Sequence, residues 1–157
     1  MVAFVKHLGR VGGNDNAPGD PAAGKIVYEA KGRCAACHVI DNRGGNLGPD
    51  LTDIGRFRGI ESLQESLIDP EANLPVNYRA IQVVTKSGAT VAGIRLNEDD
   101  FSIQLRDTQD NLRSFLKQDL KEIRRDRPSL MPKYGSILTR QELTDLVAYL
   151  SSLRGSP

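Results

Sequence analysis

Apolar residues recur at helical spacing in three segments of the chain. Asp20 and Pro21 suit the N-cap and the first turn of one helix, and Thr139 with Glu142 forms a capping box at the start of another. The apolar positions are Ala23, Ile26, Val27 and Ala30 in the first segment, Ile60, Leu63, Leu67 and Ile68 in the second, and Leu143, Leu146, Val147 and Leu150 in the third. The predicted helices cover about residues 20–31, 60–69 and 139–153. We expect the first and last helices to pack on each other.

Between the second and third helices the pattern alternates with a period of two, which predicts strands. Four such runs are centred on Ile81 and Val83, on Val91 to Leu96, on Phe101, Ile103 and Leu105, and on Leu112 to Leu116. Short turns separate the runs, and strands joined by short turns form an antiparallel meander. We therefore predict that about residues 76–126 form a β-insertion in a helical fold.

Length and charge restrict the classes of function. The 157 residues suit one domain, and 21 Lys and Arg against 20 Asp and Glu leave no basic surplus to hold a nucleic acid backbone. No apolar run approaches the roughly 20 residues of a membrane-spanning helix. The chain has four Tyr, four Phe and no Trp, so we expect another large apolar body to fill part of the core.

The two cysteines, Cys34 and Cys37, are followed directly by His38. Cys-x-x-Cys-His is the attachment signature of c-type haem, in which two thiols one turn apart bond to one porphyrin edge and the imidazole falls beneath the iron. Residues 42–51 are rich in turn formers and predict a loop that lines the haem edge. A ligating histidine normally donates its second ring N–H to a carbonyl, and Pro49 is the candidate acceptor.

A structural zinc site and a redox-active dithiol are the alternative uses of this cysteine pair. Zinc needs four nitrogen or sulfur ligands, and beyond the cluster the chain offers only His7. A redox dithiol stands at the start of a helix that follows a strand, whereas here a helical segment and a glycine turn come first. Covalent haem fits the sequence better than either.

Met131 is the candidate for the sixth iron ligand, because the only other methionine is Met1. Pro128 and Pro132 bracket it and restrict the backbone, which suits a loop that presents one sulfur rigidly. A gap-filling core methionine is the structural alternative. The chemical alternatives are a vacant sixth position on the iron, or ligation of that position by His7 or a lysine.

These motifs together resemble a class I c-type cytochrome. The segments that carry the resemblance are Cys34-Ala-Ala-Cys-His38, Gly48-Pro-Asp-Leu51, Leu130-Met-Pro-Lys-Tyr134 and Glu142-Leu-Thr-Asp-Leu-Val-Ala-Tyr-Leu150. The resemblance covers about residues 20–75 and 127–154. It implies a mainly α cytochrome c fold around one covalent haem c, which becomes α+β overall with the inserted antiparallel meander.

The resemblance also implies a set of haem contacts. His38 and Met131 would be the axial ligands, and the carbonyl of Pro49 would accept from His38. Arg56, Arg58 and Arg127 are candidates to pair with the haem propionates, although solvation at the surface is the favoured role for any single one of them, and Tyr78 is a candidate to hydrogen-bond a propionate. The residues expected to bind the cofactor are Cys34, Cys37, His38, Pro49, Leu51, Arg58, Tyr78, Met131 and Leu146.

The interval between His38 and Met131 is longer than in a simple class I cytochrome. Residues 69–78 and 84–93 resemble haem-binding domains of large secreted bacterial dehydrogenase-like proteins. That resemblance implies a redox partner protein, or a fused dehydrogenase or cytochrome domain. The predicted sheet could cover a haem edge, dock a partner domain or brace the Met131 loop, and a structural role is favoured.

Residues 1–19 are predicted to be a linker and the tail of a preceding domain, because residues 2–10 match residues 147–155 in the order of their apolar and aromatic positions. The cytochrome domain would then be residues 20–157. Residues 1–12 lack the features of a secretory leader, yet haem attachment in this family takes place outside the bacterial cytoplasm. We therefore expect a periplasmic or otherwise extracytoplasmic domain, either excised from a longer polypeptide or freed of its leader.

One-electron transfer requires no acid, base or nucleophile, so we expect an electron carrier and not an enzyme. The alternative is a haem-based sensor or peroxidase-like protein in which the Met131 ligand is displaceable. A third hypothesis is a binding module whose active surface is the predicted sheet.

Overall fold

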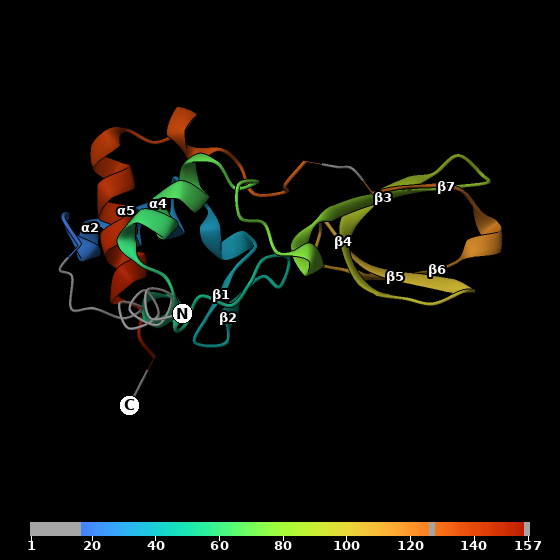
Figure 1. Ribbon diagram of the computed structural model, residues 1–157, viewed down its shortest axis with the longest axis horizontal. Coiled ribbons are helices and arrows are strands. Elements are labelled where there is room, and N and C mark those ends of the chain that lie inside the picture. The colour runs from blue at the N-terminus through green and yellow to red at the C-terminus, as the bar shows by residue number, and fades with distance from the viewer. Residues whose placement is uncertain (1–16, 126–127, 156–157) are drawn as a thin grey trace, which may run out of the picture.

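The computed structural model describes residues 17–125 and 128–155, and it has a helical part and a sheet part side by side (Figure 1). The helical part contains α2 (Pro21–Glu29), α3 (Ile54–Phe57), α4 (Ile60–Ile68) and α5 (Arg140–Ser152). Short 3-10 helices lie at Cys34–Ala36, Val76–Tyr78, Lys117–Asp119 and Tyr134–Ser136. Helix accounts for 34% and strand for 26% of the structure, so the expectation of a mainly α fold is only partly met. The predicted sequence match of residues 2–10 lies outside the described residues.

Helices α2 and α5 pack against each other, as the sequence predicts. Asp20 caps α2 by accepting from the Ala22 amide at 2.8 Å, and its own amide donates to Asp145 of α5 at 2.8 Å. The backbones meet at Gly24, where a β-carbon would overlap the carbonyl oxygen of Asp145. Glycine therefore permits the close crossing of the two helices. Thr139 and Glu142 form the predicted capping box of α5.

A small hairpin follows the cysteines where the sequence predicts only a loop. Strand β1 (Val39–Ile40) pairs with β2 (Arg43–Gly44) across a two-residue turn. Asp41 and Asn42 in the turn have φ values of 49° and 62°, and Asn and Asp tolerate this left-handed region better than other residues with side chains. The hairpin returns the chain to the backbone of His38, where a β-carbon on Gly44 would overlap the His38 carbonyl oxygen.

The sheet contains five antiparallel strands in the order β6-β5-β4-β3-β7. The strands are β3 (Ala80–Thr85), β4 (Thr90–Glu98), β5 (Ser102–Asp107), β6 (Leu112–Leu116) and β7 (Leu120–Arg124). The first four form the predicted meander. The fifth, β7, pairs with β3 and was not predicted, because a bulge sets its inward residues Leu120 and Ile123 three positions apart instead of two.

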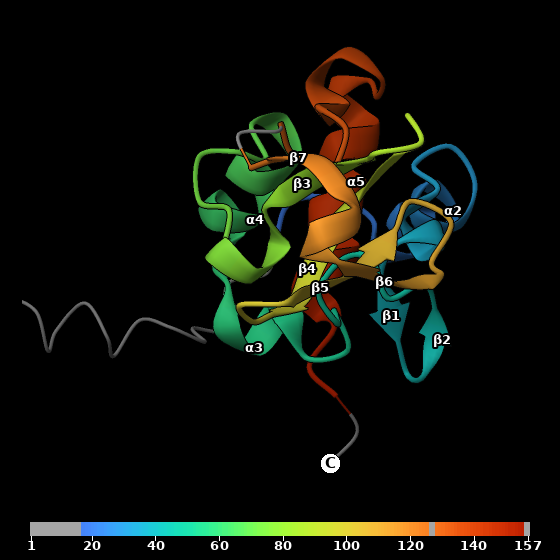
Figure 2. The same cartoon turned by 90° about the vertical axis from the view of Figure 1, so that its right-hand side faces the viewer.

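The sheet curls upon itself, as Figures 1 and 2 show. Strands β6 and β7 lie at opposite edges, yet only Lys117–Asp119 connect them, a segment that spans at most about 14 Å. Strand β4 makes the curl possible, since residues 90–94 pair with β3 and residues 93–98 pair with β5, so that the two partners overlap only at Gly93 and Ile94. The concave face encloses a small separate core. Its fully buried side chains are Val83, Ile103 and Leu105.

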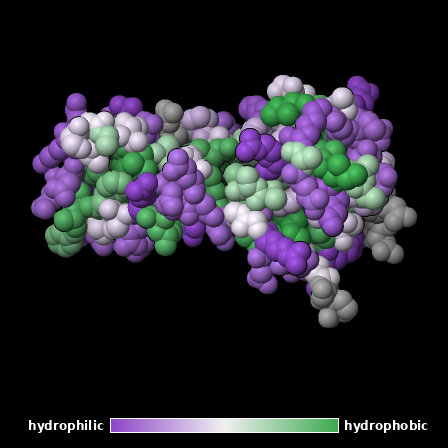
Figure 3. Space-filling model, turned by 180° about the vertical axis from the view of Figure 1, so that it is seen from behind, coloured by the Kyte–Doolittle hydropathy of each residue, from purple (hydrophilic) through white to green (hydrophobic). Residues whose placement is uncertain are grey.

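The surface is predominantly polar, with scattered apolar side chains on both parts (Figure 3). The most exposed large ones are Phe101, Phe57 and Leu112, and single exposed apolar residues are ordinary on protein surfaces. No helix among the described residues has the length and apolar character needed to cross a membrane.

Candidate functional site

Cys34, Cys37 and His38 line a cavity in the helical part beside the sheet. The cavity holds about 1330 Å³ of space free of protein atoms, including its open mouth. Its wall is largely apolar, as in most sites for organic cofactors. The leucines in the wall are Leu47, Leu51, Leu63, Leu67, Leu74, Leu130 and Leu150.

A single tight turn places both thiols and the imidazole on this wall. The amides of Cys37 and His38 both donate to the carbonyl of Cys34, at 3.1 and 2.9 Å. Arg33, just before the turn, has the left-handed φ of 49°, which turns the chain from α2 toward the cavity. Cys34 is buried and Cys37 is half-buried.

The chemistry of the two thiols disfavours a redox dithiol. Burial raises the pKa of Cys34, and burial followed by the charge of Asp110 raises the pKa of Cys37. Redox-active cysteines have lowered pKa values, because the thiolate is the reactive form. A zinc site also lacks support, since no group of three or more His, Cys, Asp or Glu capable of holding a metal occurs in residues 17–125 and 128–155.

His38 makes the hydrogen bond that the sequence predicts. Its Nδ1 lies 2.8 Å from the carbonyl oxygen of Pro49. Because a carbonyl can only accept, Nδ1 carries the hydrogen and Nε2 keeps its lone pair. Burial lowers the pKa of His38 despite this contact, so the ring is held in the neutral form that binds metals.

Met131 is partly buried and lines the same cavity. The loop that carries it is fixed on both sides of the sulfur. The Met131 amide donates to the hydroxyl of Ser129 at 3.2 Å, and Lys133 pairs with Asp69 at 3.0 Å. Tyr134 then donates to the carbonyl of Gly32 at 2.6 Å. The loop is thereby connected to the turn that holds the cysteines.

The other predicted cofactor contacts divide into two groups. Leu51, Arg58 and Tyr78 line the cavity, and Arg58 also donates to Ser62 at 3.1 Å. Leu146 was expected to contact the cofactor but does not line the cavity, because it is fully buried among the packed helices. Leu150, one turn later on α5, lines the cavity in its place.

The remaining candidates lie away from the cavity. Arg56 does not line the cavity, and its Nε lies 3.9 Å from Oδ1 of Asp53. Arg127 and His7 lie outside the described residues.

The sequence reasoning missed several lining residues. Ile94 of β4 is buried and brings the sheet into the wall. Ser66 and Asn73 add polar side chains to the lining, which also contains Arg58 and Tyr78. Ser66 follows Ser62, the hydrogen-bond partner of Arg58, by one turn of α4, and this spacing is visible in the sequence. Nothing in the sequence around Ile94 indicates that it belongs to a site.

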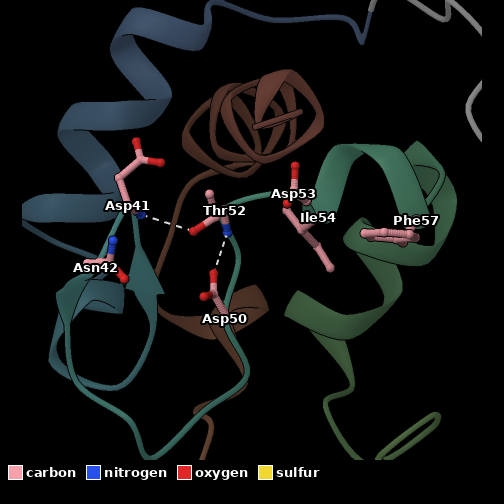
Figure 4. A pocket seen from close by; sticks show the side chains of 7 residues that line it. All are labelled: Asp41, Asn42, Asp50, Thr52, Asp53, Ile54 and Phe57. Atoms are coloured by element: carbon pink, nitrogen blue, oxygen red, sulfur yellow. Dashed lines mark hydrogen bonds between the residues drawn. The ribbon is translucent and has the colours of Figure 1, made fainter. Parts of the chain in front are cut away.

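A second pocket is formed around residues 50–54 (Figure 4). It is lined by Asp41, Asn42, Asp50, Thr52, Asp53, Ile54 and Phe57. The Thr52 amide donates to Asp50 at 2.7 Å and its hydroxyl accepts from the Asp41 amide at 2.9 Å. These contacts shape the loop, and the hydrogen bonds from Thr52 lower the pKa of Asp50. The cysteines and the histidine do not line this pocket; they line the apolar cavity described above.

The helices, the Cys-x-x-Cys-His turn and the apolar cavity define a haem-binding electron-transfer domain. The chain belongs to the cytochrome c family: the sequence model described as Cytochrome c matches residues 21–102, about half of the chain. No curated protein shows a significant match. The matched segment begins at α2 and includes Cys34, Cys37, His38 and Pro49, and it ends before the Met131 loop. Membership implies haem attached through cysteines, electron transfer and a redox partner.

Proposed function

We propose that this domain carries one haem c, bonded to Cys34 and Cys37 with His38 and Met131 as axial ligands, and relays single electrons. One observation carries the proposal: a single apolar cavity is lined by both thiols, by a neutral imidazole and by the only internal thioether of the chain. When bound, the haem iron supplies a one-electron ferric/ferrous couple.

The residues of the cavity fit the group. The apolar wall suits the macrocycle, and the raised pKa values keep both cysteines as thiols instead of competing metal ligands. The lining also offers polar groups for propionates, namely Arg58 and Tyr78, which the sequence predicts, and Ser66 and Asn73, which it does not. A porphyrin in this space would also be the large flat body that supplements eight aromatic rings.

His38 and Met131 have different supports in this proposal. The Pro49 carbonyl holds the tautomer of His38 that presents Nε2 to the iron, and a hydrogen-bonded imidazole is a more electron-rich ligand. The Met131 sulfur is presented by a loop attached through Tyr134 to the backbone just before Cys34. A His/Met ligand pair and a dry pocket both raise the reduction potential, because they disfavour the additional charge of ferric iron.

The proposal extends to domain organisation, location and partners. Residues 20–157 form the cytochrome domain, and about residues 76–126, which contain the sheet at 80–124, are the insertion. The domain works outside the cytoplasm with a redox partner protein, a fused dehydrogenase or a second cytochrome domain. The resemblance of residues 69–78 and 84–93 to domains of secreted dehydrogenase-like proteins supports this arrangement.

Covalent attachment is tested by expressing the chain with a c-type haem attachment system and denaturing the product. We expect one haem per chain to remain bonded after acid and organic solvent extraction. Cys34→Ser and Cys37→Ser should each leave a single bond, and the double variant should release all haem. Full release from the unmodified chain, or retention by the double variant, would overturn the proposal.

A further inference from the structure

The turn between β5 and β6 reaches across to the loop that follows the cysteines. Its Asp110 carboxylate accepts from the backbone amide of Asn46 at 3.2 Å and lies 3.4 Å from the Asn46 side-chain amide. These two residues are 64 positions apart in the chain. This contact connects the sheet to the polypeptide beside the cysteines.

The Asp110 carboxylate is held in place from its own side as well. Arg106 donates to its Oδ1 at 2.8 Å, and the Asp110 amide donates to the carbonyl of Asp107 at 3.0 Å. Asp107 in turn accepts from the amides of Gln109 and Asn111 at 2.9 Å each. Asp110 has a left-handed φ of 66°, a conformation that Asp, Asn and Gly adopt most readily. The turn therefore presents one fixed carboxylate.

Asn46 sits in the middle of a segment that lines the haem attachment turn. On one side of it, the Gly45 amide donates to the carbonyl of Ala35 at 2.9 Å. On the other side, the Gly48 amide donates to the carbonyl of Cys37 at 2.7 Å. Leu47 between them is buried and lines the cavity. A contact that holds Asn46 in place therefore also holds Leu47 and Gly48, which line the cavity next to Cys37.

We propose that Asp110 is a positioning residue of the sheet, which holds residues 45–48 against the cysteine turn and places a negative charge beside the haem at Cys37, thereby lowering its reduction potential. The inference rests on the proposed haem function. It gives the sheet a defined task, in which one turn of the sheet sets both the shape and the charge of one haem edge.

The sign of the effect follows from elementary electrostatics. The oxidised haem carries one more positive charge than the reduced haem, so a nearby carboxylate stabilises the oxidised form and lowers the potential. Arg106 carries the opposite charge and partly offsets the carboxylate. Both side chains are partly exposed, and salt therefore weakens their effects.

Redox titration of three variants tests the charge. Asp110→Asn preserves the shape and the left-handed backbone, and we expect its potential to rise above that of the unmodified protein. Arg106→Gln removes the offsetting charge, and its potential should fall. Asp100→Asn is the matched control, because Asp100 is exposed and lies in the β4–β5 turn. This turn is at the end of the sheet away from the helices, where the Lys117 amide donates to the carbonyl of Phe101. Its potential should remain unchanged.

Opposite shifts in Asp110→Asn and Arg106→Gln would support an electrostatic role, because a general loosening of the cavity would move both variants in the same direction. Equal shifts in Asp110→Asn and Asp100→Asn, or shifts of the same sign in Asp110→Asn and Arg106→Gln, would overturn the charge role. The extraction assay on each variant distinguishes a failure of this inference from a failure of the proposed function. If the haem stays covalently bonded but the reduction potential does not change, this inference is wrong and the proposed function stands.

The contact is tested by hydrogen exchange at the backbone amide of Asn46. Asp110→Gly tolerates the positive φ but removes the acceptor, and we expect the Asn46 amide to exchange at least severalfold faster. Asp110→Asn retains a carbonyl oxygen, and the amide should stay close to its original protection. Equal exchange in the unmodified protein and in Asp110→Gly would overturn the positioning role.

Discussion

The hydroxyl of Tyr134 donates a 2.6 Å hydrogen bond to the carbonyl oxygen of Gly32, 102 residues earlier in the chain. The same hydroxyl lies 3.9 Å from the sulfur of Cys34. Both groups are buried, so neither would find water if the bond were broken. The bond joins the Met131 loop to the cysteine turn, which are the two segments that must lie on one cavity for an iron to be bound by residues from both.

Replacing Tyr134 by Phe tests this connection. The variant leaves a buried carbonyl without a partner, and we expect the free energy of unfolding to fall by about 1–3 kcal/mol. Tyr149→Phe is the control, since the described residues offer the Tyr149 hydroxyl no hydrogen bond, and it should change stability by less. Urea unfolding followed by circular dichroism measures both. Equal losses in the two variants would show that the Tyr134 bond has no special role.

The fit between Gly48 and His38 gives a second prediction. A β-carbon on Gly48 would lie 2.5 Å from Cε1 and 2.7 Å from Nδ1 of the His38 ring. Gly48→Ala should therefore push the ring away from Pro49 and destabilise the fold by about 1–3 kcal/mol. In Gly59→Ala the new methyl meets nothing within 4 Å, so this variant should lose only the smaller amount that alanine costs relative to glycine at a helix N-cap. Thermal unfolding of the two variants checks the prediction, and a Gly48→Ala protein as stable as Gly59→Ala would contradict it.

The close crossing of α2 and α5 at Gly24 gives a third prediction. Gly24→Ala would force a methyl group into the backbone of Asp145, which cannot move without separating the helices. We expect a loss of about 3 kcal/mol, at the upper end for overpacked cores. Gly135→Ala, whose methyl would lie 3.8 Å from Ile68, should change little. Chemical denaturation distinguishes them, and a mild Gly24→Ala variant would mean that the crossing is looser than described.

The sheet should lose stability in acid. Hydrogen bonds and charge from Arg125, Lys117 and Arg95 hold the pKa of Glu98 at about 2, and Arg113 with the Asn111 amide does the same for Asp107. Ordinary values for these carboxyl groups are 4.5 and 3.8. Because the pKa is lower in the folded state, the stabilisation is complete above the unfolded value and is lost as the pH falls toward about 2.

Thermal midpoints measured from about pH 6 down to about pH 2 test this dependence. The unmodified protein should show a falling midpoint over that range. The thermal midpoint of Asp107→Asn should be lower than that of the unmodified protein at the highest pH and should fall less steeply as the pH decreases, because one of the titrating groups is gone. Parallel curves for the two proteins would show that Asp107 contributes nothing to the acid response.

Local signals predicted the parts of the fold that local chemistry determines. Asp20 and Thr139 mark helix starts by satisfying free backbone amides, and the period of two over residues 80–85 follows from a strand with one buried face. The Cys34–His38 turn is local, and Pro49 follows His38 by only 11 positions, so the geometry of the turn and of this contact depends mainly on one short segment of chain. These predictions agree with the structure.

Other features depend on contacts between distant segments, which no local pattern encodes. Strand β7 escaped prediction because its bulge broke the alternation at Lys121. Leu146 and Leu150 occupy the same face of α5, and only the packed structure shows which of them reaches the cavity. Ile94 and Asp110 reach the site because the curled sheet lies against the helical part, an arrangement that the alternation within each strand does not specify.

The near-infrared absorption of the ferric protein tests the central claim most directly, since a weak sulfur-to-iron charge-transfer band reports a methionine bound to haem iron. Met131 is the only methionine besides Met1. We predict that the unmodified holoprotein shows the band at neutral pH and that Met131→Ala abolishes it while the haem stays covalently attached. Absence of the band from the unmodified protein, or its persistence in Met131→Ala, would contradict His38/Met131 ligation and favour a sensor or peroxidase-like haem site.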